Sequence, residues 1–227
     1  NEKIIYGKTV MNDVDIAVAV VTGKHTFDIP GFQQMFSSMS NMEFYLQDLE
    51  NFVADVGKYN DKYDVVLFYN FHQQTPVADE RDGAMILNSI NKLAENGQGI
   101  FVLHHAILAF PNWEIWSQIV GITDRRFGYH GNQTIQTDLM DDSHPITYGL
   151  KSWEMVDETY TMNEVGDDSQ PLLAIDHVNS MHTVGWTRYY GNGRVFCYQS
   201  GHDNQSFYNP NFRTVLFRGI QWLANRI

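Results

Sequence analysis

Histidines that follow apolar segments are the side chains of this sequence best suited to chemistry. Nine histidines occur in the 227 residues. Those that follow predicted strands are His25, His72, His104, His105 and His202. Loops after neighbouring strands of a parallel sheet converge at its carboxyl edge, so we expect these imidazoles to share a polar pocket. Imidazole binds divalent metals and also acts as a general base, so either chemistry suits such a pocket.

A divalent metal such as zinc is one prediction for this pocket, and no other cofactor is expected. No H-E-x-x-H or H-x-H motif occurs, so histidine spacing alone does not specify a metal site. The first candidate ligands are His25, His105, His130 and His202. Adjacent residues of an extended chain point to opposite faces, so only one of His104 and His105 should enter the pocket easily.

Carboxylates and aromatic rings complete the candidate site. The segment WEMVDETY (153–160) places Asp157 and Glu158 beside Tyr160, which is typical of an acid or base next to a substrate platform. The same pair is equally typical of acidic residues that cap or solvate a loop. Residues predicted to bind a substrate are Asn70, His72, His104, Trp113, Tyr160 and Asp203.

The elements that must position these residues alternate in the first half of the chain. Continuous apolar runs predict strands, and amphipathic segments predict helices. The predicted strands are 15–23, 42–49, 64–74 and 97–106, and the predicted helices are 30–39 and 79–97. Strands that alternate with helices indicate a parallel sheet covered on both faces.

From about residue 129 the sequence changes to short segments rich in Thr, Val and aromatic residues. A YGNGR turn (190–194) separates two of them, so we expect β-hairpins added to the sheet or its rim. An amphipathic helix is predicted over 212–227. No linker rich in Pro or Ser intervenes, so residues 1–227 are predicted to form a single domain.

Charge and composition disfavour several kinds of partner and structural feature. Fifteen Lys and Arg against 27 Asp and Glu give a net charge of −12, which disfavours nucleic acid as a partner. No apolar run approaches the ~20 residues that span a bilayer. The single cysteine, Cys197, excludes an intramolecular disulfide framework. The chain begins at Asn1 without an initiator Met, which suggests that an upstream segment was removed; bacterial cytoplasm and periplasm both remain open as compartments.

Several short motifs resemble, in order, the trehalose-utilisation (ThuA-like) family of the class I glutamine amidotransferase-like superfamily. They are LHHA (103–106), HPITYGL (144–150), DETY (157–160), GRVF (193–196) and SGHD (200–203). The resemblance extends from residue 15 to the end of the chain. It implies an α/β fold: a flavodoxin-like three-layer sandwich with a mainly parallel central sheet and helices on both faces.

The resemblance also implies a function. The turn that carries the nucleophilic Cys in the amidotransferases reads His104-His105-Ala106 here, so we expect no glutaminase activity. His105 is expected to face the pocket, with His104 packed behind it. The family is linked to trehalose and keto-sugars. We therefore predict an enzyme, a hydrolase, lyase or isomerase, that acts on a trehalose-like or keto-glycoside carbohydrate through His105, Glu158 and Asp157, with or without a metal.

Two other functions fit the same residues. The first is a non-catalytic sugar-binding or interaction module that kept the scaffold after losing the thiolate. The second is a metal-dependent hydrolase of a non-sugar ester or amide. Fold alone does not separate them. The sequence also leaves the oligomeric state open, and a homo-oligomer is compatible with it.

Overall fold

The chain is described by a computed structural model over residues 16–59 and 62–227. The strands are β1 (Ile16–Gly23), β2 (Met42–Asp48), β3 (Val65–Asn70), β4 (Gly99–Leu103), β5 (Gly128–Leu139), β6 (Trp153–Thr161), β7 (Gln170–Ile175), β8 (Thr183–Tyr190) and β9 (Gly193–Tyr198). The helices are α1 (Ile29–Ser37), α2 (Leu49–Tyr59), α3 (Arg81–Asn96), α4 (Glu114–Val120), α5 (Asn204–Phe207) and α6 (Pro210–Leu223), and a 3-10 helix, η2, covers His104–Leu108.

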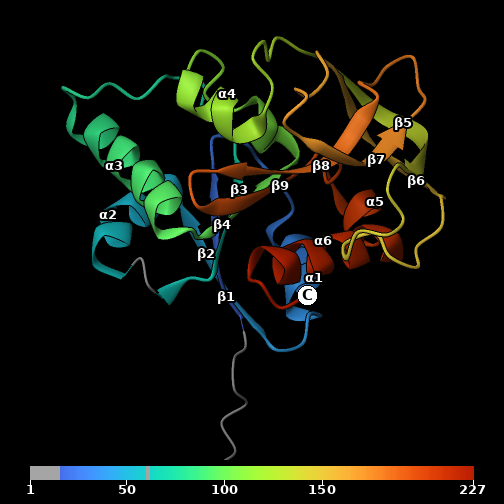
Figure 1. The fold of residues 1–227 in the computed structure, drawn as a ribbon, viewed down its shortest axis with the longest axis horizontal. Helices are drawn as coiled ribbons and strands as arrows, with labels where there is room; N and C mark the ends of the chain where they lie inside the picture. Colours follow the sequence, from blue (N-terminus) through green and yellow to red (C-terminus); the bar gives the residue numbers. More distant parts are fainter. Residues whose placement is uncertain (1–15, 60–61) are drawn as a thin grey trace, which may run out of the picture.

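The strands form one mixed sheet in the order β2-β1-β3-β4-β9-β8-β7-β5-β6 (Figure 1). Strands β2, β1, β3, β4 and β9 pair in parallel, and every pair from β9 to β6 is antiparallel. The prediction of a mainly parallel sheet was therefore wrong. Parallel pairing needs long crossovers, which the first half supplies with helices, whereas a tight turn joins β8 directly to β9. The predicted hairpins thus extend the sheet itself.

Helices cover both faces of the sheet, as expected for a three-layer arrangement. Alternate residues of β1 point to opposite faces. Val18 and Val20 belong to a core that contains residues of α1 and α6. Ala19 and Val21 belong to a second core that contains residues of α2, α3 and α4. The sheet is therefore buried on both sides in its parallel half, which leaves the strand ends as the places where polar groups gather.

The structure differs from the predicted elements in two places that matter for the site. Helix α2 was not predicted, because LENFVADVGKY follows β2 with no turn residue between them; Leu49, Phe52 and Val53 nevertheless have helical spacing. The predicted strand 97–106 ends at Leu103, and the chain then enters η2. The adjacent histidines therefore lie in a turn and not on extended chain.

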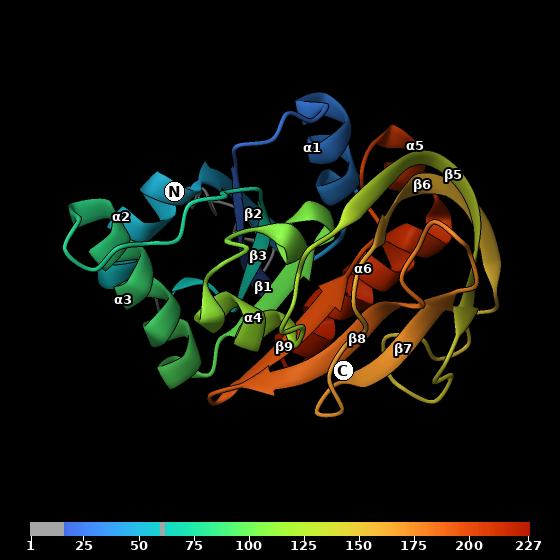
Figure 2. The same cartoon turned by 90° about the horizontal axis from the view of Figure 1, so that it is seen from above.

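Strands β5 and β6 curve together at the end of the sheet farthest from α2 and α3 (Figure 2). They pair antiparallel from Gly128–Thr161 to Thr137–Trp153, with an irregularity between His130 and Gln133. Strand β6 also contacts α5, whose N-terminus follows β9 closely in the sequence. This curvature brings the end of β6 near the carboxyl end of β4.

The loop between β5 and β6 is fixed by an aspartate and a histidine. The carboxylate of Asp141 accepts hydrogen bonds from the backbone N–H groups of Ser143 (2.9 Å) and His144 (3.2 Å). Nδ1 of His144 accepts one from the N–H of Ile146 at 3.2 Å, and its ring lies 5.3 Å from that of Trp222 in α6. Burial lowers the pKa of His144, so the neutral form fits this loop.

Stability is therefore expected to fall below pH 6.5 in part through His144. The unfolded chain then binds a proton that the folded chain refuses, so the free energy of unfolding decreases as pH falls, by at most ~1.4 kcal/mol per pH unit for one group. His144→Asn keeps an acceptor for Ile146 and removes the titration. Urea denaturation between pH 7 and pH 5 should show a shallower slope for it than for the exposed control His182→Gln; equal slopes would contradict the assignment.

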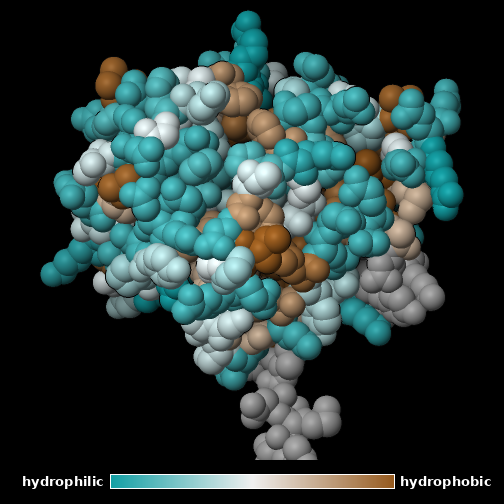
Figure 3. Space-filling model, turned by 180° about the vertical axis from the view of Figure 1, so that it is seen from behind, coloured by the Kyte–Doolittle hydropathy of each residue, from teal (hydrophilic) through white to brown (hydrophobic). Residues whose placement is uncertain are grey.

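The face opposite to that of Figure 1 is mostly hydrophilic, with its largest hydrophobic area near the middle and smaller ones towards the rim (Figure 3). Most large hydrophobic side chains of the described residues are buried in the two cores. Among the described residues, no helix is both long and apolar enough to cross a membrane.

Candidate functional site

The turn after β4 places His104 in an unusual backbone conformation. All five residues of β4 are buried, and His104 follows with φ = +53°. A positive φ is uncommon for a residue with a side chain and often marks a functional turn. His104 thus lies at the strand-to-helix turn that was predicted to lack the nucleophilic Cys. Cys197 lies on β9, where burial raises the pKa of its thiol, so it does not supply a nucleophile here.

The imidazole of His104 is fully buried and has its tautomer fixed by the backbone. Its Nδ1 lies 2.6 Å from the carbonyl oxygen of Gln199, which accepts only from an N–H, so Nδ1 carries the proton. Nε2 is left with a lone pair, and the hydroxyl of Tyr160 lies 2.8 Å from it. An imidazole whose other nitrogen donates to a carbonyl is the usual arrangement of a metal ligand.

Three possible ligand atoms meet beside this lone pair. His104 Nε2 lies 3.2 Å from His202 Nδ1 and 3.6 Å from Glu158 Oε1, and the last two atoms are 3.5 Å apart. Tetrahedral zinc with bonds of ~2.0–2.2 Å separates neighbouring ligand atoms by about 3.3–3.6 Å. The triangle therefore has the size of one face of a zinc site. We call these three residues the metal triad.

The charge of Glu158 suits a ligand. Burial alone would raise the pKa of its carboxyl group, but the imidazoles of His104 and His202, which bind and attract the carboxylate when they are protonated, hold the pKa below its ordinary value. Glu158 is therefore ionised at neutral pH. Its side chain is 13 % exposed, so the carboxylate is only partly shielded from solvent.

Buried residues around the triad hold it in place. The carboxylate of Asp157 accepts hydrogen bonds from the backbone N–H groups of Gly201 (2.8 Å) and His202 (3.1 Å). The hydroxyl of Tyr69 donates to the carbonyl of Gly201 at 2.8 Å. Asp157 and Tyr69 are 2 % and 1 % exposed. Both groups thus fix the loop that carries His202, and Asp157 is oriented towards backbone instead of solvent.

A second pair of histidines lies next to the triad. The ring centroid of His105 lies 4.2 Å from that of His25 and 4.3 Å from that of Tyr69. Neither ring nitrogen of His105 makes a hydrogen bond of ordinary geometry. Burial, followed by the charges of His104 and His25, pushes the pKa of His105 far down, and burial also lowers the pKa of His25. Both imidazoles are neutral at pH 7.

The residues predicted to bind a metal lie in different places in the structure. Of the predicted ligands, His202 belongs to the triad, whereas His25 and His105 pack beside it. His130 lies on β5, 3.5 Å from the hydroxyl of Thr161. His104 is the histidine of the adjacent pair that belongs to the triad, whereas His105 packs against aromatic rings. This is the reverse of the expected orientation. The reason is the positive φ of His104, because the prediction assumed that His104 and His105 lie on an extended chain.

The predicted substrate-binding residues are spread more widely. Asn70 and His72 bond to each other at 3.1 Å. Trp113 packs in the core against Phe110 and Trp116. Asp203 caps α5 by accepting from Gln205 N at 2.8 Å. Tyr160 and His104 are the two that lie at the triad.

Two residues of the site were not predicted from the sequence. Gln199 accepts from His104 through its carbonyl and bonds Tyr160 N through its side-chain oxygen at 3.1 Å. Tyr69 resembles a core residue in the apolar run VVLFYN, and its hydroxyl role is visible only once β9 is placed beside β4. The position of Gln199 directly after β9 is a signal that could have identified it.

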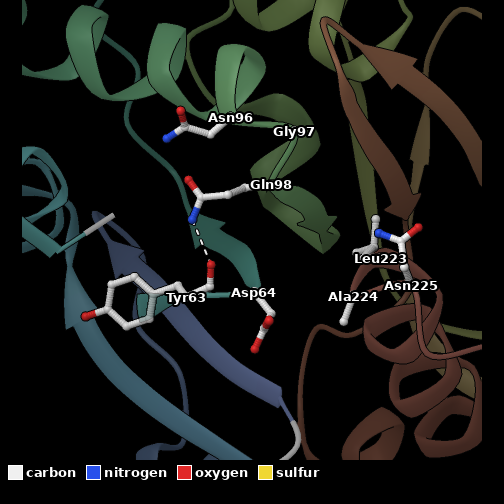
Figure 4. Close-up of a pocket in the computed structure, with 8 residues that line it drawn as sticks. All are labelled: Tyr63, Asp64, Asn96, Gly97, Gln98, Leu223, Ala224 and Asn225. Atoms are coloured by element: carbon white, nitrogen blue, oxygen red, sulfur yellow. Dashed lines mark hydrogen bonds between the residues drawn. The ribbon is translucent and has the colours of Figure 1, made fainter. Parts of the chain in front are cut away.

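A cavity of about 530 Å³ lies at the other edge of the sheet, before β3 and β4 begin (Figure 4). Tyr63 and Gln98 line it and are joined by a 2.7 Å hydrogen bond from the Gln98 amide to the Tyr63 carbonyl. It contains no histidine. Since ligands of open parallel sheets bind at the carboxyl edge, the triad is the better candidate for function.

Comparisons with known proteins agree with this architecture. A ThuA-like protein from Parabacteroides merdae is 19% identical over 92% of this chain and 90% of its own, with a TM-score of 0.75. One from Bacteroides uniformis is 15% identical over 98% and 95%, with a TM-score of 0.71. A glutamine amidotransferase from Thermotoga maritima is 8% identical over 91% and 98%, with a TM-score of 0.53.

These structural similarities show a shared α/β fold of the glutamine amidotransferase type with a large mixed sheet. A comparison with curated proteins gave no significant match. The sequence family described as trehalose utilisation (ThuA) matches residues 18–223, which include every strand after the first residues of β1 and all three members of the triad. The chain therefore belongs to the ThuA family.

Proposed function

We propose that this protein is a metal-assisted enzyme that acts on a neutral carbohydrate, of trehalose-like or keto-glycoside type. The observation that carries the proposal is the metal triad, in which His104, Glu158 and His202 present three ligand atoms 3.2–3.6 Å apart. Zinc would be held by these residues, and when bound it would polarise a sugar hydroxyl or keto oxygen as a Lewis acid.

The remaining chemistry belongs to the residues around the triad. Nδ1 of His25 makes no hydrogen bond, and the imidazole is neutral at pH 7. It can therefore take a proton from a sugar hydroxyl or from a carbon beside a keto group. Burial and the nearby charge of Glu158 raise the pKa of Tyr160 well above its ordinary value, so its hydroxyl stays protonated and remains a hydrogen-bond donor beside Nε2 of His104.

Membership of the ThuA family supports the carbohydrate part of the proposal. The absence of an elbow thiolate argues against glutaminase chemistry, because His104 stands at that turn and the buried Cys197 does not reach it. His105 then acts as a buried wall of the site and not as the catalytic base, because burial keeps it uncharged and Tyr69 packs against its ring.

The proposal is tested by assaying chelator-treated protein with trehalose, with aryl glucosides and with their 3-keto derivatives. Turnover of at least one of them should appear on addition of one equivalent of zinc or manganese and should be lost in His25→Asn, with the metal still bound. Sugar binding without turnover by the metal-loaded protein would instead favour a binding module. Turnover that is independent of added metal would contradict the role of the triad.

Asp157→Asn should weaken metal binding without changing the ligands. Its carboxylate orients the loop of His202 through two backbone N–H groups, and an amide can accept with one oxygen only. Loss of such supporting contacts typically costs ~10–100-fold in metal affinity. Competition with a chromophoric chelator should show this loss at an unchanged stoichiometry of one. Affinity equal to that of the wild type would show that Asp157 does not position His202.

A further inference from the structure

A second cavity, of about 600 Å³, lies beside the site, where the loop after β3 meets the start of α3. Its size falls in the ~300–1,000 Å³ range of small-molecule pockets. Unlike the cavity of Figure 4, it lies at the carboxyl edge of the sheet, because Lys24 and Phe71 directly follow the ends of β1 and β3. The proposed chemistry does not use it.

Phe71 joins this cavity to the histidines. Its side chain lines the cavity, and its ring centroid lies 5.8 Å from the rings of both His25 and His105. The cavity and the histidine cluster, which comprises His25, His105 and the metal triad, therefore share one aromatic wall.

His72 lines the cavity with an imidazole whose orientation is fixed by a hydrogen bond. The amide N–H of the fully buried Asn70 donates to Nδ1 of His72 at 3.1 Å, so the ring proton of neutral His72 is on Nε2. Nε2 makes no hydrogen bond, although Glu50 Oε1 lies 3.6 Å away. The ring stacks on Phe110 at 5.8 Å.

Gly23 keeps His72 in this position. Its φ is +138°, and a Cβ at this residue would lie 2.8 Å from Cε1 of His72. Any larger residue would therefore push the ring away. The backbone of β1 and the amide of Asn70 together orient the imidazole, as expected for a side chain that recognises a ligand.

The charges of the lining select the type of ligand. Glu50, Glu80 and Asp82 line the cavity together with one cation, Lys24, which gives 1 − 3 = −2. A phosphate or carboxylate ligand would be repelled. The carboxylates accept hydrogen bonds from hydroxyl groups, and the amides of Gln73 and Gln74 both donate to and accept from them. Phe71, Phe110 and Ile86 add apolar surface, a mixture that suits the polar edge and apolar face of a sugar.

We infer that this cavity is a second sugar subsite, which binds the distal ring of a neutral glycoside whose first ring lies at the histidine cluster. The inference rests on the proposed function for the identity of the ligand. It adds that the protein recognises two linked rings and discriminates against phosphorylated sugars.

The test uses zinc-loaded protein and calorimetric titration with trehalose, maltose and cellobiose, with glucose and with trehalose 6-phosphate. Thr75 lines the cavity, so Thr75→Trp should fill it. At least one disaccharide should bind the wild type and bind this variant at least tenfold more weakly, with glucose affinity unchanged within twofold. The phosphate ester should bind the wild type at least tenfold more weakly than trehalose.

Asn88→Trp is the matched control, because residue 88 is exposed on α3 and does not line the cavity. It should bind all sugars like the wild type. Equal disaccharide affinity in the wild type and Thr75→Trp, parallel loss of glucose, or no disaccharide binding at all would each overturn the subsite. The proposed function fails by a different result, the absence of metal-dependent turnover, so the two failures are distinguishable.

Discussion

Glu158→Gln is expected to reduce the affinity for zinc at least ~100-fold, because the neutral amide is a poor zinc ligand and this is a first ligand instead of a supporting contact. The substitution preserves the shape of the side chain. It also removes the negative charge beside His104 and His202, which lie 3.6 and 3.5 Å from Oε1. The measurement is a competition titration with a chromophoric chelator at fixed pH.

Glu154→Gln provides the control on the same strand, since Glu154 is exposed and lies outside the triad. Its zinc affinity should equal that of the wild type. Thermal unfolding should give similar midpoints for the wild type and both metal-free variants, so a loss of zinc in Glu158→Gln would not reflect unfolding. A zinc affinity for Glu158→Gln within threefold of the wild type would remove Glu158 from the coordination sphere.

Arg125→Met is expected to lower the free energy of unfolding by about 3–5 kcal/mol, the range for removal of one member of a buried polar network. Arg125 is 2 % exposed. Its guanidinium donates to the carbonyl groups of Ile107 (3.0 Å), Ala109 and Phe110 (2.5 Å), and to the hydroxyl of Ser117 at 3.1 Å. Burial lowers its pKa to about 10, so it remains charged at neutral pH.

The loss of Arg125 would also disturb the site, because three of its partners lie in or just after η2, the element that begins with His104. Urea denaturation should show the decrease, and the thermal midpoint should fall by about 6–20 °C. The neighbouring Arg126→Met is the control. Arg126 is exposed and, among the described residues, forms its ion pair with Asp124, so the change should stay within about 0.5 kcal/mol. Equal effects of the two substitutions would contradict the account.

Most elements of the first half, with the exception of α2, could be predicted because each has a distinct local pattern. The apolar run of β1 and the amphipathic pattern of α3, with Gly97 at its end in a left-handed conformation, specify a strand and a helix without knowledge of their neighbours. The direction of pairing in the second half is a long-range property. Strands β5 and β7 pair although residues 153–161 lie between them as β6, and nothing local signals this arrangement.

The general location of the site could also be predicted, because polar residues after buried strands must gather at one edge. Which histidines meet could not. The backbone torsion of +53° at His104 has no local signal, and the hydrogen bonds from the backbone N–H groups of Gly201 and His202 to Asp157 join residues 44 or more positions apart. Such contacts exchange the expected roles of His104 and His105 and bring Glu158 to the imidazoles.

The most direct test of the central claim is the zinc content of protein purified without chelator or affinity nickel and then incubated with one equivalent of zinc. We expect close to one zinc per chain after desalting for the wild type, and none for His104→Asn or His202→Asn. His130→Asn, which changes a histidine outside the triad, should retain it. No zinc in the wild type, or zinc retained when either triad histidine is replaced, would contradict the metal triad.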